Sequence, residues 1–199
     1  MSLDVRTLAA LLAWASLLQA MALGIQYSFI RERESLRWWT LGAFLTTSGF
    51  TLNALRDLSG LGTVATFLNT PLLLAGASLN YAGTRSFFRR NVPWKTLGIT
   101  LGFFMAAIAW FTFVQDKLLI RRVLLSIVAS SLSLLTAKAF WEGQTEALRN
   151  SVRFLASVFL AYGIYFLLRG VSALALLAYP SMANATGGLE IVYFVALTC

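Results

Sequence analysis

The stretch "LRWWTLGAFLTTSGFTLNALRD", residues 36–57, decides the fold class of this chain. Arg37 and two tryptophans open it, Arg56 and Asp57 close it, and no charged side chain lies between them. A helix that crosses the hydrocarbon core of a bilayer needs about 20 apolar residues, and tryptophan is enriched where such helices meet the headgroups. The pattern therefore predicts a membrane-spanning helix whose charged ends mark the two water boundaries.

The composition extends this interpretation to all 199 residues. Hydrophobic side chains make up 58% of the chain and charged side chains 12%, whereas soluble domains have about 45–50% apolar and about 25% charged residues. A soluble fold of this composition would have too little polar surface, so we expect the lipid bilayer to be the main partner. The net charge of +8 does not indicate a nucleic-acid partner, because the basic residues form short clusters between apolar segments.

Six apolar segments are long enough to span a membrane as helices. They are Leu8–Ile30, Trp38–Leu55, Leu61–Thr84, Thr96–Val114, Leu118–Trp141 and Phe154–Ala178. A seventh begins near Leu189 and covers only about 16 Å by Cys199, half of the hydrocarbon core. We expect one all-α domain over residues 1–199, a polytopic membrane helix bundle with six complete spans and a truncated seventh. We also expect it to be the N-terminal part of a longer protein.

Lysine and arginine are unevenly distributed between the two sides of this bundle. The connections after the first, third and fifth segments carry ten of them, and the opposite side carries five. Because cytoplasmic loops have an excess of these residues, the N-terminus is predicted outside the cell and the C-terminus, after seven crossings, inside. Trp38, Trp39, Phe87 and Phe88 lie beside basic residues and are predicted at the inner headgroup level.

The residue types that the chain lacks exclude several classes of function. It contains no histidine and one cysteine, Cys199. Histidine-ligated metal sites, Ser-His catalysis and cysteine metal clusters therefore have no side chains to build on. The sequence also contains no glycine-rich phosphate-binding loop. We predict no catalytic, metal-ligating or cofactor-binding residue in these 199 residues.

Arg169, in "FLLRGVSALALL", is the most informative polar residue. A charge within a span is costly unless it is paired or hydrated, so Arg169 should face the bundle interior or a water-filled outer vestibule. Glu190 is its expected partner. Other charged residues predicted at the same outer mouth are Arg56, Asp57, Arg121 and Arg122. Two interpretations stay open, an outer pocket for a small anionic or amphiphilic ligand and a structural Arg169–Glu190 pair.

Polar residues within the second and third segments indicate contacts between helices. Asn53, Asn69 and Asn80 each need a hydrogen-bond partner at membrane depth. Packing between helices is the simpler interpretation, and contact with a ligand is the alternative. Pro71 removes the helical donor to the carbonyl of Phe67, which predicts a kink and a candidate hinge.

Small residues in the fourth and fifth segments predict close approach of helices. Ser126, Ser130 and Ser133 form a stripe at helical spacing, which is typical of a packed helix face. Gly98 and Gly102 have the spacing of a helix-dimer contact in membranes. This pair is the basis for considering a homodimer.

Two stretches carry a resemblance to a known family, "LRWWTLGAFLTTSGFTLNALRD" and "VATFLNTPLLLAGASLNYAGTRSFFRR". The marks are the Trp-Trp entry, the helix ending in Leu-Arg, the apolar "LNTPLLLAG" and the exit "TRSFFRR". The chain resembles the N-terminal multi-helix sensor regions of bacterial diguanylate cyclases with a GGDEF output domain, and some histidine kinases carry related regions. The resemblance implies a place in the bacterial inner membrane. No Gly-Gly-Asp/Glu-Glu-Phe sequence occurs here, so these residues would control such an enzyme and not catalyse its reaction.

The leading hypothesis is therefore a sensory and anchoring module that regulates a cytoplasmic domain making cyclic di-GMP. A histidine kinase output is the alternative within the same class. A small membrane transporter or channel subunit is the rival from another class, since polar residues lie at membrane depth. A passive anchor that senses nothing is the third hypothesis.

Overall fold

The structure is a computed structural model that describes residues 5–29, 34–55, 62–114, 118–143 and 146–178. Its helices are α1 (Val5–Phe29), α2 (Glu34–Leu55), α3 (Gly62–Phe87), α4 (Trp94–Phe113), α5 (Leu118–Glu142), the short η1 (Glu146–Leu148) and α6 (Arg149–Ala178). The described part contains no strand, so the predicted all-α class is confirmed. Six predicted segments coincide with α1 to α6, and the predicted seventh lies outside the described residues.

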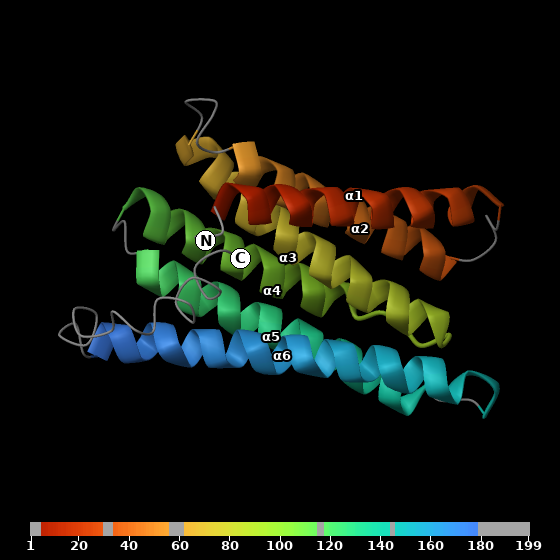
Figure 1. The fold of residues 1–199 in the computed structure, drawn as a ribbon. Coiled ribbons are helices and arrows are strands. Elements are labelled where there is room, and N and C mark those ends of the chain that lie inside the picture. Colours follow the sequence, from red (N-terminus) through yellow and green to blue (C-terminus); the bar gives the residue numbers. More distant parts are fainter. Residues whose placement is uncertain (1–4, 30–33, 56–61, 115–117, 144–145, 179–199) are drawn as a thin grey trace.

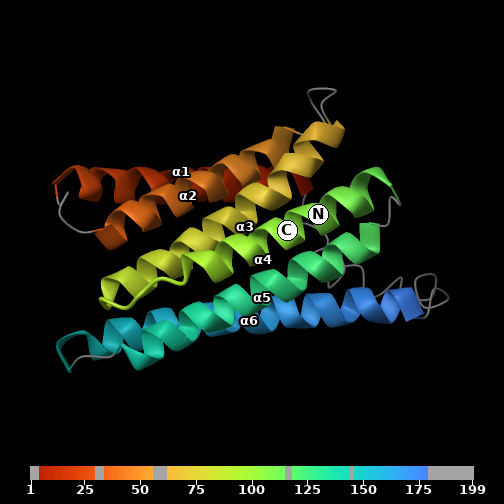
Figure 2. The same cartoon turned by 180° about the vertical axis from the view of Figure 1, so that it is seen from behind.

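The long helices lie roughly along one direction and alternate in polarity along the chain (Figure 1). α1 packs on α2, α2 on α3, and α5 on α6, while α3 contacts both α4 and α5. The first residues of α1 and the last residues of α6 lie at the left-hand end of Figure 1, and Figure 2 shows the same order of helices from behind. The C-terminal ends of α1, α3 and α5 therefore share the opposite end of the bundle.

Three helices are long and apolar enough to cross a membrane, α4 over Trp94–Phe113, α5 over Leu119–Glu142 and α6 over Arg149–Ala175. Within these spans, 56% of the α5 residues are buried, against 11% in α4 and 22% in α6, so α5 is the most buried of the three. α2 and α3 have sufficient length but contain more glycine, serine, threonine and asparagine. The chain thus has the helices of a membrane-associated protein, and six complete crossings remain a prediction.

α2 packs against α3 through four glycines spaced by seven residues, which we call the heptad glycines. They are Gly42 and Gly49 on α2 and Gly76 and Gly83 on α3. A Cβ at Gly76 would lie 2.8 Å from the carbonyl oxygen of Gly42, and a Cβ at Gly42 would lie 3.0 Å from that of Gly76. Because the obstacle is backbone on both sides, only glycine permits this approach.

A tryptophan on α2 forms hydrogen bonds to α3 at one end of the α2–α3 pair. Trp39 on α2 donates from Nε1 to the carbonyl of Asn80 at 3.2 Å and to the hydroxyl of Thr84 at 3.4 Å. Its ring also lies where a Cβ at Gly83 would be, with Cδ1 at 2.5 Å. Trp39 was predicted at the headgroup level, and the structure shows that it also packs between the two helices.

Five of the six hydroxyl groups of α2 are satisfied within the helix. Each of the five donates to the carbonyl four residues earlier, at 2.8 to 2.9 Å, and they belong to Thr40, Thr46, Thr47, Ser48 and Thr51. Such bonds remove the cost of placing a hydroxyl in an apolar environment. A helix with this many polar side chains is therefore compatible with burial or with lipid.

The serine stripe of α5 faces α6. Ser130 donates from Oγ to the carbonyl of Gly163 at 2.8 Å, and a Cβ at Gly170 would lie 3.1 Å from the Cβ of Ser126. The close packing predicted for this stripe is confirmed at both serines. On its other side α5 contributes Val128 and Leu132 to an apolar core shared with α3 and α4.

Candidate functional site

Three arginines gather where α5 begins and α6 approaches its end, and we call them the arginine cluster. Arg122 lies within electrostatic range of both Arg121 and Arg169. Arg121 donates from Nη1 to the hydroxyl of Thr112 on α4 at 3.1 Å. The sequence predicts these three residues at one mouth of the bundle, and the structure brings them together from two helices, α5 and α6.

Arg169 is the buried member of the arginine cluster. Its exposed fraction is 6%, and its Cζ atom lies 5.9 Å from the centre of the Phe166 ring. The next residue, Gly170, lies against Ser126 of α5, so the neighbouring backbone is held close to that helix. Burial of a guanidinium is costly unless charge and hydrogen bonds compensate it. We therefore expect a change of charge at Arg169 to alter the packing of α5 against α6.

Several predicted partners of this mouth lie outside the described residues. They are Arg56, Asp57 and Glu190. The proposed Arg169–Glu190 pair is thus untested, and the choice between a ligand pocket and a structural ion pair stays open. Asn53 belongs to α2, but its side chain is also outside the described set.

The polar residues of α3 have different surroundings. Asn80 lies against α2, with its Oδ1 atom 2.6 Å from the position of a Cβ at Gly42, which agrees with a role in packing. Asn69 has its Oδ1 atom buried and accepts no hydrogen bond from the described residues. Pro71 lies inside α3, which continues on both sides of it.

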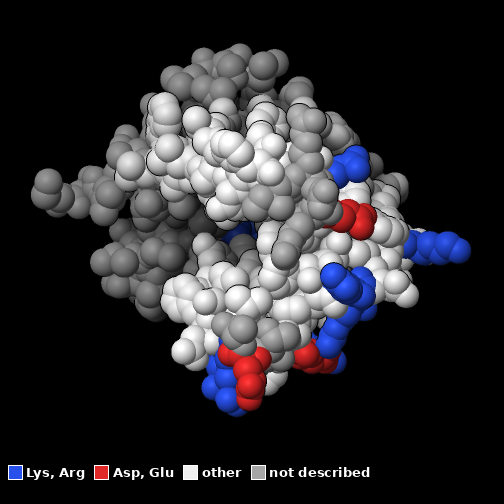
Figure 3. Space-filling view, turned by 90° about the vertical axis from the view of Figure 1, so that its right-hand side faces the viewer, with Lys and Arg blue, Asp and Glu red and all other residues white. Residues whose placement is uncertain are grey.

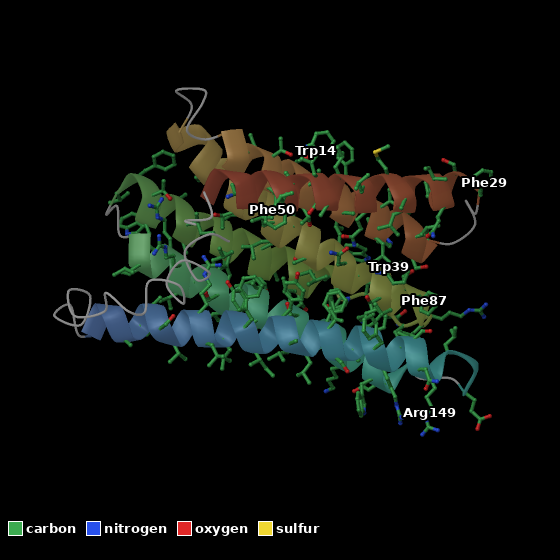
Figure 4. The ribbon with its side chains drawn as sticks, in the orientation of Figure 1. Trp14, Phe29, Trp39, Phe50, Phe87 and Arg149 are labelled. Atoms are coloured by element: carbon green, nitrogen blue, oxygen red, sulfur yellow. The ribbon has the colours of Figure 1, made fainter. Side chains whose placement is uncertain are left out.

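The glycine pair predicted for dimer contact lies on an uncovered face of α4. A Cβ at Gly98 or at Gly102 would meet no atom within 4 Å, and the neighbouring Ile99 and Phe103 are exposed. α1 also turns large side chains outward, as Trp14 and Phe29 show in Figure 4. These faces are apolar surfaces of the kind that lipid covers, and the homodimer remains a prediction.

The end of the bundle opposite the arginine cluster carries most of the described charge, and we call it the basic end. Figure 3 views it directly, with lysine and arginine in blue among a few acids in red. The basic residues there are Arg37, Arg85, Arg89, Arg90, Lys95, Lys138, Arg149 and Arg153. Arg90 forms an ion pair with Glu142 and also donates from Nη2 to its backbone carbonyl at 3.2 Å. This contact ties the end of α3 to the end of α5.

A chain of aromatic rings crosses the bundle just inside the basic end. Trp39, Phe87, Phe88, Phe140 and Phe159 follow one another with ring centres 5.0 to 5.9 Å apart. They come from α2, the end of α3, α5 and α6, and Figure 4 shows Trp39 and Phe87 at this end. The sequence placed the two adjacent phenylalanines at the headgroups, whereas Phe88 packs on the buried Phe140.

The turn after α3 explains why Phe88 points inward. Arg89 has φ +52°, its N–H bonds to the carbonyl of Ser86 at 3.0 Å, and the N–H of Arg90 bonds to that of Arg85 at 2.9 Å. This pair of bonds is the Schellman motif, in which glycine usually occupies the left-handed position. The sequence has arginine there, so the usual signal for this turn was missing.

Comparisons with family models, with curated proteins and with solved structures found no match for this chain. Among the described residues, no group of three or more metal-ligating side chains comes together. Within the described residues, the arginine cluster and the basic end are therefore the two features that bear on function.

Proposed function

We propose that this chain is a membrane-embedded sensory and anchoring module of a bacterial inner-membrane signalling protein. It would regulate a cytoplasmic output domain that follows residue 199 and makes cyclic di-GMP, with a histidine kinase as the second choice of output. The observation that carries the proposal is the difference between the two ends. One end holds the arginine cluster, in which Arg169 is buried among apolar helices, and the other holds most of the exposed basic residues, which favour the cytoplasm.

A route between the ends is available through α5. This helix begins at the arginine cluster, is the most buried of the three candidate spans, and carries Phe140 of the aromatic chain in its last turn. An outer ligand shifts a protein between two packings only by binding one of them better. An anionic ligand at Arg122 and Arg169 would favour a packing in which the two guanidinium groups lie closer together. The signal would leave through α6 and the helix predicted after it.

The topology is tested with single cysteines and a membrane-impermeant maleimide in intact cells. Cys199 is the only cysteine, so Cys199→Ser gives a clean background. Val114→Cys, at the end of α4 beside the arginine cluster, should react in intact cells. Arg89→Cys and Glu146→Cys, at the basic end, should react only after lysis. Labelling in the reverse order would refute the orientation and the proposed route.

Sensing is tested with the chain joined to a diguanylate cyclase domain through the remainder of the predicted seventh helix. Arg169→Leu should change the cyclic di-GMP level at equal membrane content, because it removes the buried charge of the cluster. Lys95→Leu, at the exposed basic end, is the matched control and should leave output close to wild type. Equal output from all three proteins would leave a passive anchor as the function.

One observation favours the transporter rival, the buried Oδ1 atom of Asn69 beside Pro71 in α3. Polar groups on interrupted helices line the substrate sites of many transporters. Flux of a small solute into liposomes that contain the purified chain, abolished by Asn69→Leu, would support this rival against the sensory module.

A further inference from the structure

An open groove runs between α5 and α6 on the surface of the bundle. Its volume is about 360 Å³. Its walls include Leu134 and Ala137 of α5 and Ala156 and Leu160 of α6. A second hollow of about 220 Å³ continues it along the same two helices and shares Leu134. Apolar side chains dominate both hollows, so the combined track suits a flexible hydrocarbon chain.

The end of this groove is cationic and aromatic. Lys138 and Trp141 line it at the basic end, and 70% of the Lys138 side chain is exposed. The guanidinium of Arg153 lies 6.0 Å from the centre of the Trp141 ring. Glu142 lies 3.7 Å from the Lys138 ammonium, but the same carboxylate is paired with Arg90. The mouth therefore keeps an excess of positive charge at the level where tryptophan meets headgroups.

We propose that the α5–α6 groove binds one anionic phospholipid. An acyl chain would lie along Leu134 and Leu160, and the phosphate would lie against Lys138 and Arg153. Charge decides between this occupant and a second copy of the chain, because a two-fold contact here would bring the same basic residues face to face. The site requires only that the chain is embedded in a membrane, so it stands or falls separately from the proposed signalling role.

The test is native mass spectrometry of the full chain in detergent, with phosphatidylglycerol or phosphatidylcholine of identical acyl chains. The anionic lipid should be retained preferentially. One basic residue near the headgroups changes binding about fivefold, so Lys138→Gln should weaken phosphatidylglycerol binding by about that factor. Lys95→Gln is the matched control, because Lys95 is exposed at the same end on α4 and does not line the groove.

A second pair of variants tests the groove itself. Leu160→Trp should fill it and lower retention of the anionic lipid, whereas Ile99→Trp, on the uncovered face of α4, should not. Circular dichroism of each variant is the control that it keeps its helices. Three results would each overturn the proposal. They are equal retention of the two lipids, equal effects of the two lysine variants, and equal effects of the two tryptophan variants. A dimer that Leu160→Trp dissociates would also overturn it, since that result would assign the groove to a second copy.

Discussion

Gly76→Ala is the change that most directly tests how α2 and α3 are held together. A Cβ at this position would lie 2.8 Å from the carbonyl oxygen of Gly42 and 3.2 Å from the backbone nitrogen of Thr46. The Oγ1 atom of Thr46 would lie closer still, but the carbonyl oxygen and the nitrogen are backbone atoms of the facing helix, so no side-chain rotation relieves those two contacts. The two helices have to separate by several tenths of an ångström along their whole contact.

The magnitude follows from two opposing effects. Overpacking of a filled interface costs about 1–3 kcal/mol, while alanine in place of glycine within a helix is favourable by about 0.5–1 kcal/mol. We therefore expect Gly76→Ala to lower the free energy of unfolding by about 1–2 kcal/mol. Gly102→Ala is the matched control, since its Cβ would meet no atom within 4 Å, and it should gain up to about 1 kcal/mol.

The assay is reversible unfolding in mixed micelles by titration with dodecyl sulfate, followed by circular dichroism of the helices. Wild type, Gly76→Ala and Gly102→Ala are compared at one protein concentration, so that self-association does not differ between them. The reasoning is refuted if Gly76→Ala proves as stable as Gly102→Ala. A destabilised Gly102→Ala would instead point to a contact of α4 with a second copy.

Two further changes test individual contacts by the same titration. Ser130→Ala removes the 2.8 Å bond to the carbonyl of Gly163 and should cost about 1 kcal/mol, whereas the exposed Ser131→Ala should stay within about 0.5 kcal/mol of wild type. Arg89→Gly relieves a left-handed residue and should stabilise the protein by about 0.5–1 kcal/mol. Equal effects of the two serine variants, or a loss of stability in Arg89→Gly, would contradict these assignments.

Hydropathy located each of the six long described helices but not the short η1, and its errors at the helix ends have a physical cause. The sixth segment was predicted to begin at Phe154, but α6 begins at Arg149. Likewise the second was predicted from Trp38, but α2 begins at Glu34. Apolar patterning finds the part of a helix that suits lipid, whereas the backbone bonds start earlier, in turns that carry polar and charged side chains.

The neighbours of each helix were harder to predict than its ends. The gathering of Arg121, Arg122 and Arg169 followed from counting crossings, because an alternating path returns those positions to one end of the bundle. The heptad glycines show a seven-residue spacing in the sequence, yet among the glycines only the closer spacing of Gly98 and Gly102 predicted a contact. Spacing shows which face a residue occupies, and it does not show whether another helix covers that face.

The small buried fraction of α4 has a consequence for how this protein changes over generations. A residue surrounded by lipid has only to remain apolar, since any hydrocarbon side chain fits a fluid solvent. Substitutions among leucine, isoleucine, valine and phenylalanine on α4 should therefore be tolerated in a saturation library, while the same exchanges on α5 are selected against. Diverged copies of this protein would drift apart first along α4.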